Sequence, residues 1–170
     1  MTPNASPLTP SDAEPSRLSD SSDTRQFLSF VVNKSSYGVG IEDVREIRQW
    51  MQTTTLPNQP KHILGVLNLR GSIVSIQDLR IRLGAPAPQP VETNVIVIVQ
   101  AGERRVGLLV DAVSDILTLR AEDIQPVPAS RGRNDTEAML LSLAVSGETM
   151  VGIIDLNRVM DHAMADPVDV

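Results

Sequence analysis

The sequence predicts a mainly β fold of small barrels or a sandwich, and three observations predict it. About nine or ten short segments are apolar or alternate in polarity, with turn residues between them, which is typical of such folds. The run VIVIV at 95–99 has no polar position, which indicates a strand buried on both faces. The spacer APAPQP at 85–90 favours polyproline II and separates two β-rich halves. Two barrels that share a core would bury the VIVIV strand in this way.

The half before the spacer is expected to consist of strands and one helical turn. Strands are predicted at 26–33, 37–41, 44–50, 64–69 and 72–76. Segment 44–50, VREIRQW, interleaves apolar residues with charged and polar ones, so it is predicted to be a half-buried strand. The helical turn is predicted at 78–83, with Asp78 as its N-cap and Gly84 as its end.

The half after the spacer follows the same pattern and ends in a longer helix. Strands are predicted at 94–100, 104–111, 116–119, 139–145 and 149–154, with a helical turn at 121–124 and a polar loop at 131–136. The final helix is predicted at 155–164, with Asp155 as its cap and Leu156, Val159 and Met160 on one face.

Two polar tails flank these elements and carry the charge. Residues 1–24 are rich in Pro, Ser, Thr and Asp without an apolar period, so they are predicted to be disordered. The other end is expected to fray over 165–170. The formal net charge of -6 divides equally between residues 1–24 and 161–170, and residues 25–160 are neutral. The acidic balance therefore says nothing about what the folded domain binds.

Composition argues against several kinds of chemistry and location. The chain of 170 residues has no Cys, so disulfides, thiolate zinc sites and cysteine nucleophiles are impossible. His62 and His162 are far apart and are interpreted as solvated or capping residues, and aromatic residues make up 2%. We therefore expect no metal, cofactor or nucleic acid. The N-terminal residues lack the pattern of a secretory signal and VIVIV is too short to span a bilayer, which predicts a cytoplasmic protein without direct membrane insertion.

Catalytic motifs are absent from the sequence. It contains no P-loop, no H-E-x-x-H and no G-x-S-x-G, and GVG at 38–40 lacks the third glycine of a dinucleotide-binding fingerprint. Asp111 and Asp115, followed by Glu122 and Asp123, are the candidate carboxylates of an enzyme or a small-ligand barrel. They fall at strand ends and on a turn, where capping and solvated roles are the favoured interpretation. An enzyme is the least favoured alternative.

The most distinctive stretch is GVLNLRGSIVSIQDLR at 65–80, in which two apolar strands flank a corner. Asn68 is expected to tolerate an unusual backbone conformation there and Gly71 to adopt a positive φ. Such a corner holds the Arg70 guanidinium exposed and rigid, so that it loses little entropy on binding a carboxylate or a helix end. The alternative is an ordinary surface arginine paired with an acid, which contributes at most ~1 kcal/mol.

Several blocks in the right order make the chain resemble the CheW-like chemotaxis coupling proteins, from about Arg25 to Met160. These are FLSF at 27–30, YGV at 37–39, VREI at 44–47, GVLNLRG at 65–71, DLR at 78–80 and VGLLVDAVSD at 106–115. The resemblance implies two SH3-like five-stranded β-barrels packed over a shared core, with a C-terminal helix. It divides residues 25–163 into a first barrel at about 25–84, the spacer 85–90, a second barrel at about 91–154 and a helix at 155–164.

The resemblance also implies a function and a site. Family members are adaptors without catalytic activity that couple methyl-accepting chemoreceptor tips to the histidine kinase CheA, and these partners would recruit the protein to membrane receptor arrays. The implied receptor-binding residues are Val44, Glu46, Gly65, Asn68, Arg70 and Gly71, with Val95, Gly107 and Ile116 as weaker candidates. Glu46 is expected to pair with Arg70, and CheA to dock its homologous domain barrel end to barrel end.

Some positions depart from the family pattern. Ser75 and Ser142 stand where many members have Pro and Gly. Gln125 and Ser130 stand where some members have basic and aromatic residues, which predicts a weaker or differently built contact in higher-order arrays. A CheW-like scaffold of another chemosensory pathway, such as surface motility or second-messenger control, remains the alternative function.

Overall fold

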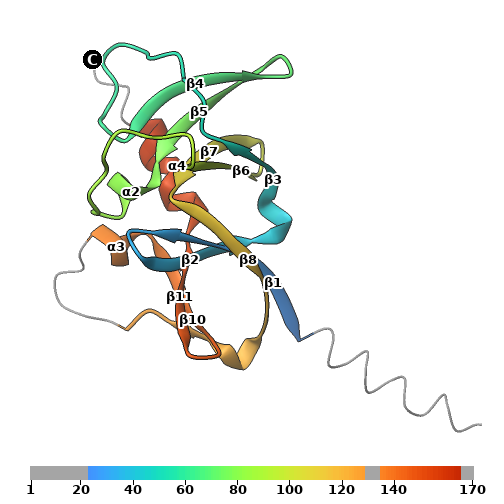
Figure 1. Cartoon of the computed structure of the whole chain (residues 1–170). Coiled ribbons are helices and arrows are strands. Elements are labelled where there is room, and N and C mark those ends of the chain that lie inside the picture. Colours follow the sequence, from blue (N-terminus) through green and yellow to red (C-terminus); the bar gives the residue numbers. More distant parts are fainter. Residues whose placement is uncertain (1–22, 129–134, 166–170) are drawn as a thin grey trace, which may run out of the picture.

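The computed structural model describes residues 23–128 and 135–165, and it divides their strands between two barrels stacked one above the other (Figure 1). Barrel I is a six-stranded sheet in the order β8 (Ala112–Arg120), β1 (Thr24–Val32), β2 (Ser35–Gly40), β11 (Thr149–Ile154), β10 (Leu140–Ser146) and β9 (Ile124–Pro126). Barrel II is a five-stranded sheet in the order β3 (Val44–Gln49), β6 (Val95–Ala101), β7 (Arg104–Val110), β5 (Ser72–Asp78) and β4 (Ile63–Leu69). The structure confirms the mainly β, two-barrel fold, although β9 gives barrel I a sixth strand.

Short helices connect these strands, and one longer helix ends the described chain. They are η1 (Ile41–Asp43), α2 (Leu79–Arg82), η2 (Ala121–Asp123), α3 (Asp135–Ala138) and α4 (Leu156–Ala165). The predicted tail up to residue 22, the end after residue 165 and most of the predicted loop 131–136 lie outside the described residues.

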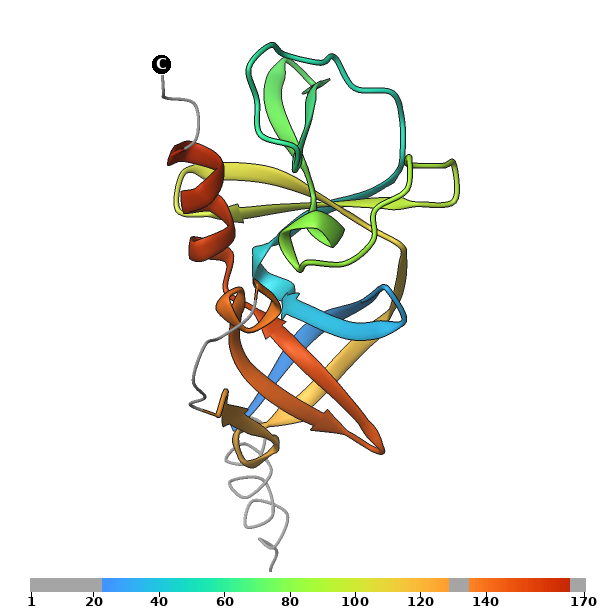
Figure 2. The same ribbon diagram turned by 90° about the vertical axis from the view of Figure 1, so that its left-hand side faces the viewer.

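The division of the chain between the barrels differs from the predicted one. Strands β1 and β2 do not share a barrel with β3–β5, because β1 pairs antiparallel with β8 and β2 pairs in parallel with β11. The chain enters barrel II after η1 and returns to barrel I after β7, and the spacer 85–90 connects two parts of barrel II (Figure 2). Pairing between strands so distant in sequence is selected by tertiary packing, which a local pattern does not report.

The VIVIV strand is buried on both faces, as predicted. Val97 and Val99 of β6 belong to the core shared by the two barrels, whereas Ile96 and Ile98 belong to the interior of barrel II. The period of two along a strand accounts for this alternation. A separate apolar cluster, which includes Phe27, fills barrel I. The protein therefore has two barrel interiors and one shared core between them.

Helix α4 closes the shared core. The Asp155 carboxylate accepts hydrogen bonds from the backbone N–H groups of Asn157 at 3.1 Å and Arg158 at 3.4 Å, which is the predicted capping role. Leu156, Val159 and Met160 are buried against the shared core, as their helical spacing predicts.

A buried ion pair in barrel II lies next to the point where the chain crosses to barrel I. Arg80 is 3% exposed and donates from Nε and Nη2 to the two carboxylate oxygens of Asp78, at 2.9 and 2.8 Å, and from Nη2 to the carbonyl of Pro88 at 2.8 Å. Its Nη1 lies 3.9 Å from the carboxylate of Asp111, which accepts a 2.7 Å hydrogen bond from the backbone N–H of Asn33 in barrel I. The hydrogen bond to Asp78 is the main cause of the raised pKa of Arg80, and burial opposes it. The DLR block is thus a structural motif that anchors the spacer and the crossing between barrels.

Candidate functional site

The β4–β5 turn presents Arg70 at the tip of a two-residue hairpin. Leu69 pairs with Ser72, and the residues between them, Arg70 and Gly71, have φ values of 55° and 90°. Two-residue hairpins with a type I′ turn require positive φ at both central positions. The expectation for Gly71 is correct, but Arg70 rather than Asn68 takes the unusual conformation. Asn68 lies in β4, and its side-chain oxygen accepts a 2.9 Å hydrogen bond from the backbone N–H of Gly71.

This backbone geometry holds the Arg70 side chain out into solvent. The side chain is 83% exposed, and it forms no hydrogen bond with another described residue. Left-handed backbone costs an L-residue other than Gly roughly 1–2 kcal/mol, so the corner carries strain at an arginine. Strain of this kind is found where a site requires a particular side chain, and here that side chain is a guanidinium.

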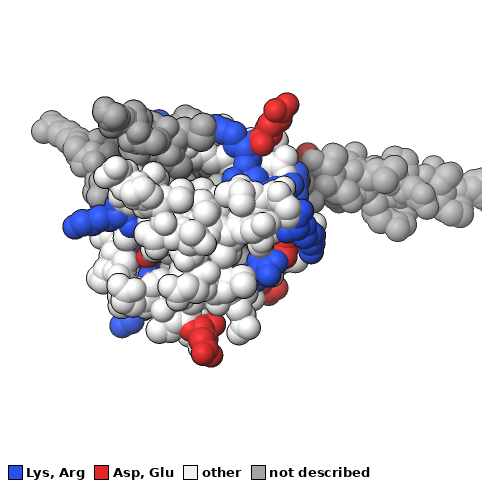
Figure 3. Space-filling view, turned by 90° about the horizontal axis from the view of Figure 1, so that it is seen from above, with Lys and Arg blue, Asp and Glu red and all other residues white. Residues whose placement is uncertain are grey.

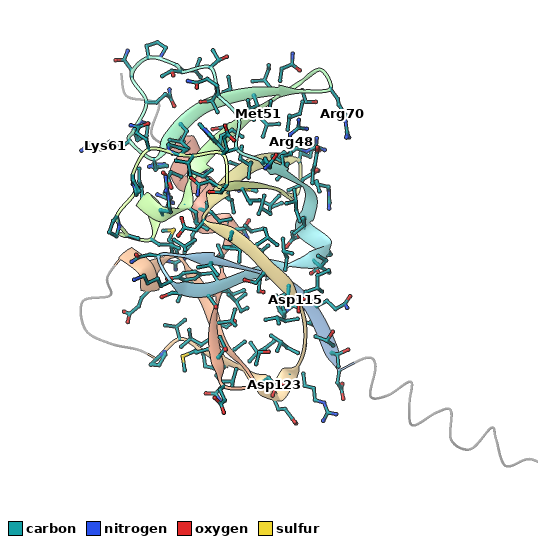
Figure 4. All side chains as sticks on the ribbon, viewed as in Figure 1. Arg48, Met51, Lys61, Arg70, Asp115 and Asp123 are labelled. Atoms are coloured by element: carbon teal, nitrogen blue, oxygen red, sulfur yellow. The ribbon has the colours of Figure 1, made fainter. Side chains whose placement is uncertain are left out.

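Glu46 is the acidic partner at the corner. Its side chain is 25% exposed, and Oε2 lies 3.8 Å from Nη2 of Arg70, so the expected ion pair is present. The shorter contact is with Arg48, whose Nη1 donates a 2.7 Å hydrogen bond to the same oxygen. In Figure 4 the labelled Arg48 and Arg70 lie at the same side of barrel II. The name arginine corner is used below for Glu46, Arg48, Asn68, Arg70 and Gly71.

Sequence reasoning missed Arg48 and the apolar side chains beside it. Residues 46–51 of β3 and its continuation line a hollow of about 500 Å³. Ile47 and Met51 expose 47% and 42% of their surfaces there. Glu46 and Arg48 are separated by two positions, which places both side chains on one face of a strand. That spacing was the available signal for the Glu46–Arg48 pair.

The remaining predicted residues are not all accessible. Gly65 has a φ of 134°, and a Cβ there would come within 2.4 Å of the carbonyl oxygen of Thr54, so this glycine permits a close backbone approach. Gly107 is enclosed in barrel II, where a Cβ would come within 3.0 Å of Ile76, Ile96 and Ile98. Val44 and Val95 are half-buried and pack against the shared core. Ile116 lies on β8 of barrel I and is half-exposed. The structure therefore brings Glu46, Asn68, Arg70 and Gly71 together, and assigns packing roles to Gly65 and Gly107.

Asp111 and Asp115, which were candidate carboxylates for an enzyme, have structural partners. Asp111 is bound by Asn33 and Arg80 as described above, and Asp115 accepts a 2.7 Å hydrogen bond from the backbone N–H of Ile116.

Burial raises the pKa of Asp43 at the end of η1, and the neighbouring Glu42 raises it further. Among the described residues, no group of three or more His, Asp or Glu side chains could hold a metal ion.

His62 is buried, 9% exposed, so the expectation that it is solvated is wrong. The side chain of His162 lies outside the described set. No helix within the described ranges is both long and apolar enough to cross a membrane.

Charge is unevenly distributed over the surface around the corner. Seen from above, the face of barrel II is largely uncharged, and Lys and Arg side chains gather along one edge with acidic groups between them (Figure 3). The described structure thus joins two barrels over one core and presents an exposed arginine at a two-residue turn.

Comparison with known proteins identifies the family. The model of the CheW-like domain matches residues 26–164, and the chain belongs to this family. It is 42% identical to the chemotaxis protein CheW of Rhizobium meliloti, over 79% of this chain and 86% of that protein. It is 38% identical to CheW of Klebsiella aerogenes, over 91% of this chain and 92% of that protein. The crystal structure of the scaffolding protein TtCheW from Thermoanaerobacter tengcongensis superposes with a TM-score of 0.71 at 29% identity, covering 77% of this chain and 88% of that one.

Proposed function

We propose that this chain is a non-enzymatic adaptor that couples chemoreceptor tips to the histidine kinase CheA. The adaptor role in chemotaxis signalling follows from its membership of the CheW-like family, whose matched members are chemotaxis and scaffolding proteins. In this proposal the protein lies in the cytoplasm, and the receptor tips and CheA recruit it to receptor arrays at the membrane.

The observation that carries the receptor site is the strained, exposed Arg70. Its backbone is held at φ 55° in a two-residue turn, and its side chain is 83% exposed. The turn fixes the direction in which the Arg70 side chain leaves the backbone, and its exposed guanidinium can donate to a carboxylate or to the C-terminal end of a helix. The hollow beside it, with exposed Ile47 and Met51, supports an apolar contact to the same partner. We propose that a receptor helix lies along this hollow with an acceptor group at Arg70.

Apolar side chains on barrel I support a second docking surface. Leu141, Val145 and Met150 on the β10–β11 hairpin are exposed by 59%, 44% and 61%. Exposed large apolar side chains of this kind favour contact with another apolar surface. We propose that this hairpin contributes to the contact with the kinase domain. Modest affinity at each site would suffice, because multivalent assembly raises the overall avidity.

The receptor site is tested by pull-down with a receptor cytoplasmic signalling fragment. Arg70→Ala and Glu46→Lys are expected to reduce binding sharply while circular dichroism shows a native fold. Lys61→Ala removes one exposed positive charge on the opposite side of barrel II (Figure 4) and is the matched control. Unchanged binding by Arg70→Ala would remove the site assignment. Co-purification with the kinase, and its loss in Met150→Glu, tests the second surface separately.

A further inference from the structure

Two arginines share one carboxylate oxygen at the corner, and they bind it unequally. Oε2 of Glu46 accepts a 2.7 Å hydrogen bond from Arg48 but lies 3.8 Å from Arg70. The Arg48 side chain is 31% exposed, and its Nη2 also lies 3.8 Å from the sulfur of Met51. The Arg70 side chain is 83% exposed. Arg48 therefore holds the carboxylate, and Arg70 is attached only loosely.

The difference between the Glu46–Arg48 and Glu46–Arg70 distances has a geometric cause. Glu46 and Arg48 are two positions apart on β3, so the strand itself places both side chains on one face. Arg70 comes from a different hairpin, and its reach depends on the turn between β4 and β5. A charge-assisted hydrogen bond of 2.7 Å belongs to the strong class, whereas an exposed pair near 4 Å contributes little.

We propose that Arg48 is a positioning residue that keeps Arg70 available to a partner. By occupying the Glu46 carboxylate, Arg48 prevents Arg70 from closing onto that carboxylate. Without Arg48, Arg70 is the remaining cation beside Glu46 and moves from 3.8 Å to hydrogen-bond distance. A partner carboxylate must then break this internal pair before it can bind. The fraction of protein molecules whose Arg70 is free to bind a partner therefore falls. The partner in this inference is the receptor helix of the proposed function, on which the inference rests.

A double-mutant cycle on binding of a receptor cytoplasmic fragment tests this role. Arg48→Ala is expected to weaken binding about two- to five-fold, the range of an exposed ion pair that must first be broken. The same substitution is expected to change nothing in a Glu46→Gln background, and Arg48→Lys is expected to restore most of the affinity. Arg45→Ala is the matched control, because Arg45 lies on the same strand but donates to Gln100 and to the Glu42 carbonyl. An equal loss in the Glu46→Gln background would show that Arg48 contacts the partner directly and would overturn the proposal.

A second measurement uses the free protein and needs no partner. The Nε–H signal of Arg70, assigned by its absence in Arg70→Lys, is expected to show low order in the wild-type ¹⁵N relaxation data. In Arg48→Ala its order is expected to rise, because the side chain closes onto Glu46. Unchanged order in Arg48→Ala would overturn the inference even if the fragment binds. If the wild-type protein binds no receptor fragment, the proposed function fails, while this measurement still decides the role of Arg48.

Discussion

Arg70→Asn is expected to make the protein more stable while it removes receptor binding. Arg70 occupies the first central position of a two-residue turn at φ 55°, followed by Gly71 at φ 90°. Asn tolerates left-handed backbone, and Asn-Gly is the preferred sequence for a type I′ hairpin turn. The substitution therefore relieves strain at the position that the proposed function needs most.

The expected change in the free energy of unfolding for Arg70→Asn is the difference between two opposing contributions. Left-handed backbone costs a residue such as Arg roughly 1–2 kcal/mol, and Asn recovers most of this cost. The lost pair with Glu46 is 3.8 Å long and 83% exposed on the arginine side, and an exposed pair of this kind contributes about 0.2–1 kcal/mol. The expected gain in the free energy of unfolding is about 0.5–1 kcal/mol, which raises Tm by roughly 1–4 °C for a domain of this size.

The assay compares wild type, Arg70→Asn and Arg70→Ala in urea unfolding and in receptor-fragment pull-down. Both variants are expected to lose binding, because both lack the guanidinium. The stability gain is expected in Arg70→Asn alone, because Ala keeps the left-handed strain. If Arg70→Asn unfolds at the same urea concentration as Arg70→Ala, or earlier, the backbone at Arg70 is not strained and the reasoning is refuted.

Three further predictions concern packing, pH and the crossing between barrels. Gly107→Ala places a Cβ 2.6 Å from Cδ1 of Ile76 and is expected to destabilise the fold by about 1–3 kcal/mol in urea unfolding; a loss below about 0.5 kcal/mol would show that barrel II has room. Because burial, followed by repulsion from Glu42, raises the folded-state pKa of Asp43 above its unfolded value, ionised Asp43 destabilises the fold at neutral pH. Asp43→Asn is therefore expected to raise Tm at pH 7, with the gain vanishing below the unfolded pKa of about 3.9; a constant gain at all pH values would contradict the titration argument. Asp111→Ala removes the acceptor of the 2.7 Å bond from Asn33 and is expected to cost about 1–2 kcal/mol, with Asp111→Asn closer to wild type; equal losses would show that the carboxylate charge, not the acceptor, matters.

The candidate site could be predicted in part from local chemistry. The NLRG block predicts a tight turn with an exposed arginine, since Gly71 permits the positive φ that the turn needs. Tolerance of left-handed backbone favours Asn68 for the unusual conformation, but the position in the hairpin decides that Arg70 must adopt it. Arg48 was missed as the nearer partner of Glu46, because a choice between two arginines depends on distances that the sequence does not contain. The binding roles of Gly65 and Gly107 stay predictions, and their close neighbours, Thr54 and Ile76, add that both positions also permit close packing.

The sequence alone determined the features that depend on neighbours along the chain. The period of two predicts the strands, Asp78 and Asp155 cap their helices through nearby backbone N–H groups, and VIVIV is buried on both faces because no position is polar. Only the tertiary structure decided which strands share a barrel: β1 and β2 join β8 and β11, and the spacer at 85–90 remains within barrel II. The reason is physical. Many pairings satisfy the same alternating pattern, and the choice among them depends on how the two barrel interiors and the shared core are filled together.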